Sequence, residues 1–246
     1  MTLSELAIHI PGSIELFEKY NFNYYQNGKQ SFKEACEEKG LSFTEIDFEL
    51  DQLQKSSKAN TMLTLEDMSI DRLIDFINGQ HHSNEEEVLE RIDTNIKKMI
   101  AIPDLEKSLL LTLVRIDLKF SEFKEKLIRH CEKEDKILFP YMRKINGVRH
   151  DKTVNDISFK NPIQLLESEH IQASSILSEI KSMTNGFSIE PDAPIAYQEI
   201  IKSLQEFEKE FHMHLHIENN ILFPKIIELE GQLKHLNKNQ HDIPHK

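Results

Sequence analysis

The chain has 246 residues, of which 42 are acidic and 30 basic, so its formal net charge is −12 at pH 7. This charge argues against a general binder of nucleic acid or anionic membranes, because both attract positive potential. No apolar run approaches the roughly 20 residues of a membrane helix, and no basic cluster at the start suggests an export signal. With only two cysteines, Cys36 and Cys131, we expect a cytoplasmic protein without a disulfide framework.

Three parts are expected along the chain. Residues 1–57 predict a small domain of short helices, because turn signals recur at Pro11-Gly12, Asn27-Gly28 and Gly40. The polar stretch at 54–61 is typical of a linker. Residues 62–230 have long helical periodicity, and residues 231–246 form a polar tail that we expect to fray. Seven glycines and eight prolines are few for this length, which favours an all-α protein.

The periodic part predicts an antiparallel four-helix bundle. Its helices are expected at about 70–102, 104–145, 162–185 and 194–222, with Pro224 interrupting the last one. The second and fourth helices share a repeat, His-x-x-x-Glu-x-x-Ile-Leu-Phe-Pro, at 130–140 and 214–224. A repeat of this kind predicts two helical hairpins that face one core across a pseudo-twofold axis.

The repeated His and Glu lie on the apolar stripes of their helices, since residues three and four apart share a helix face. These stripes run Leu113, Ile116, Phe120, Phe123, Leu127, His130, Glu134, Ile137; Leu204, Phe207, Phe211, His214, Glu218, Ile221; and, on helix three, Ile163, Leu166, His170, Ala173. Burying carboxylates and imidazoles costs several kcal/mol unless they are paired or bind metal. No Lys or Arg shares these stripes, so we expect a dinuclear site of iron, manganese or zinc.

Other polar residues have less defined roles. His81 is in phase with the apolar residues before it and His82 with those after it, so spacing leaves the ligand of helix one open. His212 and His216 are turned about 200° from His214, which predicts side chains that are solvated or lie at the rim of the core. Glu167 and Glu169, beside His170, are expected to be surface charges, with the alternative that one of them holds a ligand ring in place.

The two repeats, with His81-His82 on helix one and Glu167-Ser-Glu-His170 on helix three, resemble the hemerythrin-like di-iron domain. The small domain adds Leu-Ala-Ile-His-Ile-Pro at 6–11, Phe-Glu-Lys-Tyr at 17–20, Gly-Lys-Gln at 28–30 and Glu-Ala-Cys at 34–36. These motifs resemble the N-terminal domain of the repair-of-iron-centres family. Its members are iron–sulfur cluster repair di-iron proteins linked to nitric oxide and oxidative stress. The resemblance covers nearly the whole chain.

This resemblance implies a centre of two iron ions with an oxo or hydroxo bridge and open positions for nitric oxide or oxygen. The implied ligands, with His82 taken over His81 because it matches the family's ligand, are His82, His130, Glu134, His170, His214 and Glu218. Iron–sulfur proteins are the implied recipients, and the small domain is a candidate surface for a homodimer. Whether the site turns over nitric oxide as an enzyme, or only binds it or donates iron, stays open.

One departure from the family concerns the Cys-Cys pair that its small domain often carries before a glycine. Tyr25 and Gln26 stand there in this chain, so roles that rest on those thiols are not implied. The departure favours an alternative, a hemerythrin-like sensor or binding module for oxygen, iron or nitric oxide without turnover. A third interpretation is a structural bundle with zinc or no metal.

Overall fold

The computed structural model describes residues 1–56, 65–147 and 158–241. These residues form helices and turns with no strand, apart from one β-bridge between Thr2 and Ser31, which confirms the all-α class. By residue contacts the chain divides into two compact units, Met1–Leu73 with His212–Lys246, and Ile74–Phe211. Most of the predicted linker lies outside the described residues, and its first three residues belong to a helix that ends at Ser56.

The small helices of the first unit are α1 (Leu3–His9), α2 (Ser13–Lys19), α3 (Phe32–Glu38) and α4 (Phe43–Ser56). Capping boxes start α1 and α3, where Thr2 pairs with Glu5 and Ser31 with Glu34. An aromatic cluster fills their core, with the Phe17 ring 5.7 Å from Phe22 and 6.1 Å from Phe32. The predicted set of short helices is therefore present.

The same unit contains η5 (Glu218–Leu222) and α11 (Phe223–His241). Pro224 lies in the first turn of α11, where a helix tolerates the missing N–H of proline. The expected interruption at Pro224 and the frayed tail after Gly231 are wrong for residues 223–241, because α11 is continuous over them. The tail beyond His241 lies outside the described residues.

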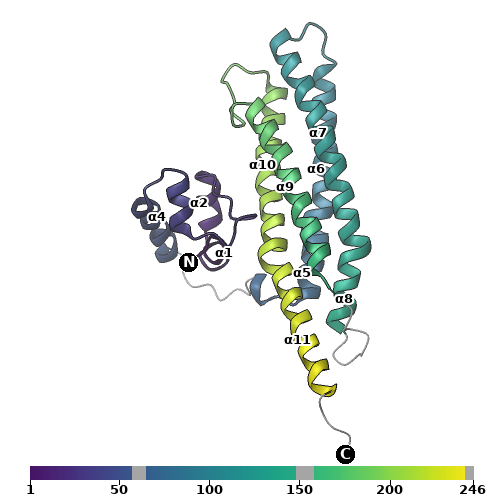
Figure 1. Cartoon of the computed structure of the whole chain (residues 1–246). Helices are drawn as coiled ribbons and strands as arrows, with labels where there is room; N and C mark the ends of the chain where they lie inside the picture. The colour runs from purple at the N-terminus through teal and green to yellow at the C-terminus, as the bar shows by residue number, and fades with distance from the viewer. Residues whose placement is uncertain (57–64, 148–157, 242–246) are drawn as a thin grey trace, which may run out of the picture. The chain divides into compact units, whose positions relative to one another are not determined.

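The second unit contains the helical bundle (Figure 1). It comprises α6 (Ser83–Ile100), α7 (Lys107–Lys133), α8 (Phe139–Gly147), α9 (Lys160–Met183) and residues 195–211 of α10 (Ile195–Ile217). The Phe123 ring meets those of Phe207 and Phe211 edge-on at 5.6 and 5.5 Å. These residues lie on the predicted apolar stripes, whose members are buried as expected except for Ile137.

The second predicted helix begins three residues late for a local reason. Asp104 has a left-handed backbone (φ 58°), which a helix interior does not accept. Glu106 then caps α7, because its carboxylate accepts hydrogen bonds from the N–H groups of Ser108 and Leu109 at 2.9 Å. The helix therefore starts at Lys107.

Three π-helical segments interrupt the long helices among the described residues. They are η2 (Ile77–His82), η3 (Glu134–Leu138) and η5, and each carries a predicted metal ligand. A π turn contains one residue more than an α turn and therefore shifts the phase of the helix beyond it. As a result Ile137, expected to be buried, is 69% exposed, whereas the next residue, Leu138, is 6% exposed.

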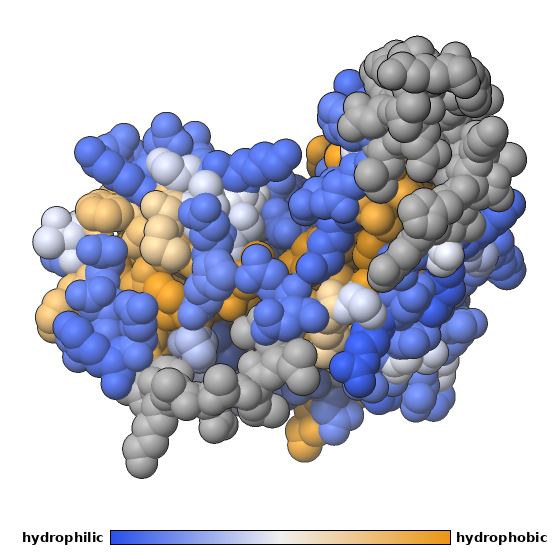
Figure 2. Space-filling model, turned by 90° about the horizontal axis from the view of Figure 1, so that it is seen from below, coloured by the Kyte–Doolittle hydropathy of each residue, from blue (hydrophilic) through white to orange (hydrophobic). Residues whose placement is uncertain are grey.

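Hydrophilic side chains cover most of the face drawn in Figure 2, as expected for a chain in which 29% of the residues are charged. Over the described ranges, none of the helices is both long enough and apolar enough to cross a membrane.

A charge network in the bundle gives the first prediction. Asp93 is 7% exposed and accepts hydrogen bonds from Lys97 at 2.9 Å and Lys124 at 3.0 Å. Burial alone would raise the pKa of Asp93, but these two lysines outweigh burial and lower the pKa. We expect Asp93→Asn to reduce the free energy of unfolding by about 1–2 kcal/mol at pH 7, because the buried position loses the charge that accepts hydrogen bonds from both lysines.

The loss should depend on pH. Because folding lowers the pKa of Asp93, its contribution is present above the unfolded carboxyl pKa of roughly 4 and disappears as the pH falls through the native value. Urea unfolding followed by circular dichroism at neutral and acid pH measures this. Asp75→Asn is the control, because Asp75 pairs with Arg143 on the surface. Equal losses of unfolding free energy in both variants would contradict the stabilising role given to Asp93 and its two lysines.

Candidate metal centre

Four of the six predicted ligands lie in the second unit and are buried there. His82 ends η2, His130 lies in the last turn of α7, Glu134 begins η3, and His170 lies in the middle of α9. Their exposed fractions are 7%, 4%, 0% and 1%. The structure therefore brings side chains from three helices of the sequence to one interior position.

The Glu134 carboxylate lies between imidazole rings. Its Oε2 atom is 3.4 Å from Nε2 of His82 and 3.3 Å from Nε2 of His130. The Nε2 atoms of His130 and His170 are 2.8 Å apart. The ligand atoms of His130, Glu134 and His170 all lie within 4.8 Å of one another, which is close enough for one metal ion to contact them all.

Two further carboxylates orient these rings. Asp135 Oδ1 lies 2.8 Å from Nδ1 of His82, and Glu169 Oε2 lies 3.0 Å from Nδ1 of His130. Metal-binding histidines characteristically have one ring nitrogen held in this way, which turns the other toward the metal. Burial opposes the charged form of Glu169, but hydrogen bonds from Lys133 and His130 outweigh it and lower its pKa.

Asp135 is a site residue that sequence reasoning missed. Glu169 follows the alternative expectation, because it contacts a ligand ring and is not simply a surface charge. Both residues are direct neighbours of predicted ligands, Asp135 after Glu134 and Glu169 before His170. That adjacency was the available signal. Which ring each carboxylate reaches depends on the packing of α7 against α9 and on the π segments, and helical spacing does not contain this information.

The remaining two predicted ligands lie in the first unit. His214 Nε2 is 3.1 Å from Glu218 Oε1, and both side chains are fully buried. Because α10 is continuous from Ile195 to Ile217, His214 extends the stripe of Leu204, Phe207 and Phe211, as the sequence predicted.

Comparison with known proteins gives the family. The sequence model of the Hemerythrin HHE cation binding domain matches residues 72–226 and 161–243. A "Probable iron-sulfur cluster repair protein" of Haemophilus influenzae is 30% identical over 226 residues, covering 92% of this chain and 96% of that protein. The chain belongs to the hemerythrin-domain iron–sulfur cluster repair family. Similar relatives include the proteins named "Iron-sulfur cluster repair protein YtfE" of Citrobacter koseri and Shigella boydii, both 28% identical over 92% of this chain and 96% of their own.

The two histidines that spacing left open, His81 and His82, both lie in the π segment η2. Both are buried, with His81 4% and His82 7% exposed, because the wider turn lets consecutive side chains point inward. The His81 ring packs edge-on against Phe76, with centroids 5.6 Å apart, whereas Nε2 of His82 faces Glu134. The geometry thus favours His82, the residue that the family resemblance implied.

The prediction that His212 and His216 are solvated is wrong. They are 8% and 2% exposed, because residues of the small domain lie against this face of α10. The Tyr25 ring stacks on His212 with centroids 3.9 Å apart, and the Tyr24 ring lies 5.4 Å from that of His216. Burial lowers the pKa of His216 to about 4, so its ring is neutral at pH 7.

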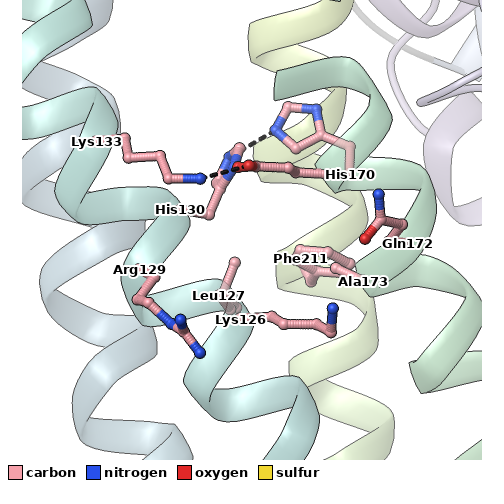
Figure 3. A pocket seen from close by; sticks show the side chains of 10 residues that line it. Lys126, Leu127, Arg129, His130, Lys133, His170, Gln172, Ala173 and Phe211 are labelled. Atoms are coloured by element: carbon pink, nitrogen blue, oxygen red, sulfur yellow. Dashed lines mark hydrogen bonds and ion pairs between the residues drawn. The ribbon is translucent and has the colours of Figure 1, made fainter. Parts of the chain in front are cut away.

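A pocket of about 240 Å³ adjoins His130 and His170 (Figure 3). Lys126 and Arg129 lie along one side of it, and Lys133 reaches the Glu169 carboxylate next to His130. A water molecule occupies roughly 30 Å³ in the liquid, so the pocket has room for several small molecules beside the imidazoles.

The carboxylates that orient the rings give the second prediction. We expect Asp135→Asn and Glu169→Gln each to weaken iron binding roughly 10- to 100-fold, because an amide holds the imidazole less firmly than a carboxylate. Chelator competition measures the affinity. Glu132→Gln is the matched control, since Glu132 pairs with Lys136 on the exposed face of the same helix. Wild-type affinity in both test variants would refute the orienting role.

Proposed function

We propose that this protein contains a non-haem di-iron centre and acts in the response to nitrosative and oxidative stress. It would repair iron–sulfur clusters by supplying iron, by binding or reducing nitric oxide at the di-iron site, or by both. The two ions would be held by the six residues that the family resemblance implies, His82, His130, Glu134, His170, His214 and Glu218. The two carboxylates would then bridge the ions.

The full burial of Glu134 and Glu218 is the observation that carries this proposal. Each is 0% exposed, and a buried ion costs several kcal/mol unless opposite charge compensates for the lost water. The imidazoles that face them are charged only when protonated, whereas a metal cation bound to neutral imidazoles supplies positive charge at any pH near 7. Mixed imidazole and carboxylate donors suit iron.

The relatives support the biological role. Their names describe iron–sulfur cluster repair, and they match this chain over nearly its full length. We therefore expect damaged iron–sulfur proteins as partners and a cytoplasmic location. The pocket beside His130 and His170 supports access by a small diatomic ligand, nitric oxide or oxygen.

A second candidate function is a sensor of oxygen, iron or nitric oxide that binds its ligand without turnover. Tyr25 favours it, because this residue replaces a family thiol and packs on His212.

A titration with nitric oxide distinguishes the candidate functions. The chain is loaded with ferrous iron under anaerobic conditions and then titrated with nitric oxide. Stoichiometric nitrous oxide indicates the reductase, and uptake without nitrous oxide indicates the sensor. If neither occurs while apo iron–sulfur protein regains its cluster, iron supply is favoured.

The third prediction tests the bridging glutamates. We expect Glu134→Ala and Glu218→Ala each to reduce bound iron from two ions per chain to fewer than one, because each removes an oxygen donor from both ions. Iron is measured by mass spectrometry on protein purified anaerobically without a histidine tag. Glu132→Ala, an exposed change two residues from Glu134, should keep two ions. Unchanged iron in both test variants would refute the bridging assignment.

A further inference from the structure

The two copies of the repeat differ at the positions next to their glutamates. In the first copy Glu134 is followed by Asp135 and Lys136, and in the second Glu218 is followed by Asn219 and Asn220. Asp135 holds His82, and Lys136 pairs with Glu132 on the surface. The asparagines of the second copy make different contacts, although the next four residues, Ile-Leu-Phe-Pro, are identical in both copies.

Both asparagines donate hydrogen bonds to the loop of residues 23–30 in the small domain. Asn219 Nδ2 donates to the Tyr25 carbonyl at 3.0 Å. Asn220 Nδ2 donates to the Tyr24 carbonyl at 3.1 Å and lies 3.0 Å from Nδ1 of His216. Since η5 consists of residues 218–222, the loop holds the turn that begins with Glu218.

One helical turn earlier, the same loop contacts α10. Tyr25 stacks on His212 with an angle of 14° between the rings, and His212 Nδ1 lies 2.8 Å from Glu18 Oε1. The Tyr24 hydroxyl donates to the same Glu18 oxygen at 3.0 Å. His212 and His216 therefore contact the small domain on both sides of His214 in the sequence.

Gly28 shows how closely the loop approaches η5. A Cβ atom at this position would overlap the side-chain oxygen of Asn220 and lie 2.9 Å from Cβ of Ser4. The Gly28 carbonyl also accepts a hydrogen bond from the N–H of Ser4 at 2.9 Å, so the loop cannot retreat without breaking a contact with α1. Only glycine fits between these two neighbours.

We infer that the loop of residues 23–30 is a positioning element for the metal ligands His214 and Glu218, and that through it the small domain controls how fast the centre releases iron. This inference rests on the proposed di-iron function. A π turn is a rare departure from the regular α-helix, and the loop contacts lie on the π turn that begins with Glu218. At the matching position of the first copy, the Lys136 side chain is 69% exposed and pairs with Glu132 of the preceding turn.

The test measures iron release into excess ferrous chelator under anaerobic conditions by stopped flow. Gly28→Ala should release iron about tenfold or more faster than the wild type, as loss of support around metal ligands commonly does. Gly231→Ala is the matched control in α11, because a Cβ there meets nothing within 4 Å, and its release should be unchanged. A wild-type rate in Gly28→Ala would overturn the inference.

A second pair of variants guards against misfolding of Gly28→Ala. The double variant Asn219→Ala/Asn220→Ala removes the donors and should also speed release, whereas Lys136→Ala, at the position of the first copy that matches Asn220, should not. Faster release in Lys136→Ala to the same extent would overturn the inference.

Hydrogen exchange of the metal-free chain separates this inference from the proposed function. Residues 218–222 should lose protection in Gly28→Ala and in the double variant, and keep it in Gly231→Ala. Unchanged protection in both test variants would refute the positioning role. If the wild type binds no iron but the exchange result holds, the di-iron function fails and the contact between loop and η5 stands.

Discussion

A carboxylate inside an apolar protein is stable only where positive charge or hydrogen bonds replace the water that it has lost. This requirement applies to both Glu134 and Glu218, because each is fully buried and each lies at the start of a π turn. Domains are stable by only about 5–15 kcal/mol, so two uncompensated carboxylates would consume much of that margin. The proposed pair of iron ions would satisfy this constraint, and the imidazole nitrogens of His82 and His130 already face the Glu134 carboxylate.

The π turns explain how two such residues fit into otherwise regular helices. Each turn accommodates an additional residue, so a ligand can point inward and the apolar stripe continues in the α-helix that follows. At η3 the stripe resumes with Leu138 and Phe139 in place of Ile137. At η2 the same widening allows His81 and His82 to be buried together.

The repeat shows one motif adapted to two surroundings. In the first copy, the residue after the glutamate is Asp135, and its carboxylate contacts the ring of His82. In the second, Asn219 reaches the backbone of the small domain, and His212 and His216 are covered by tyrosines. The internal symmetry of the repeat is therefore broken where the second copy contacts the small domain.

Much of this organisation could be predicted from the sequence. Helical spacing placed His130, Glu134, His170, His214 and Glu218 on buried stripes, because regular helices keep a constant phase. The failures occurred where phase or surroundings change locally. Spacing does not reveal a π turn, so Ile137 was misplaced and His81 could not be separated from His82. Nor does it reveal which element covers a polar face, and for this reason spacing does not predict the burial of His212 and His216 or the contact of Glu169 with His130.

Anomalous X-ray scattering at the iron edge, from crystals of anaerobically purified protein, tests the di-iron centre most directly. We predict two iron peaks per chain, each next to an oxygen of both Glu134 and Glu218. No peak at this position, with both carboxylates contacted by water or by lysine and arginine side chains, would contradict the di-iron assignment.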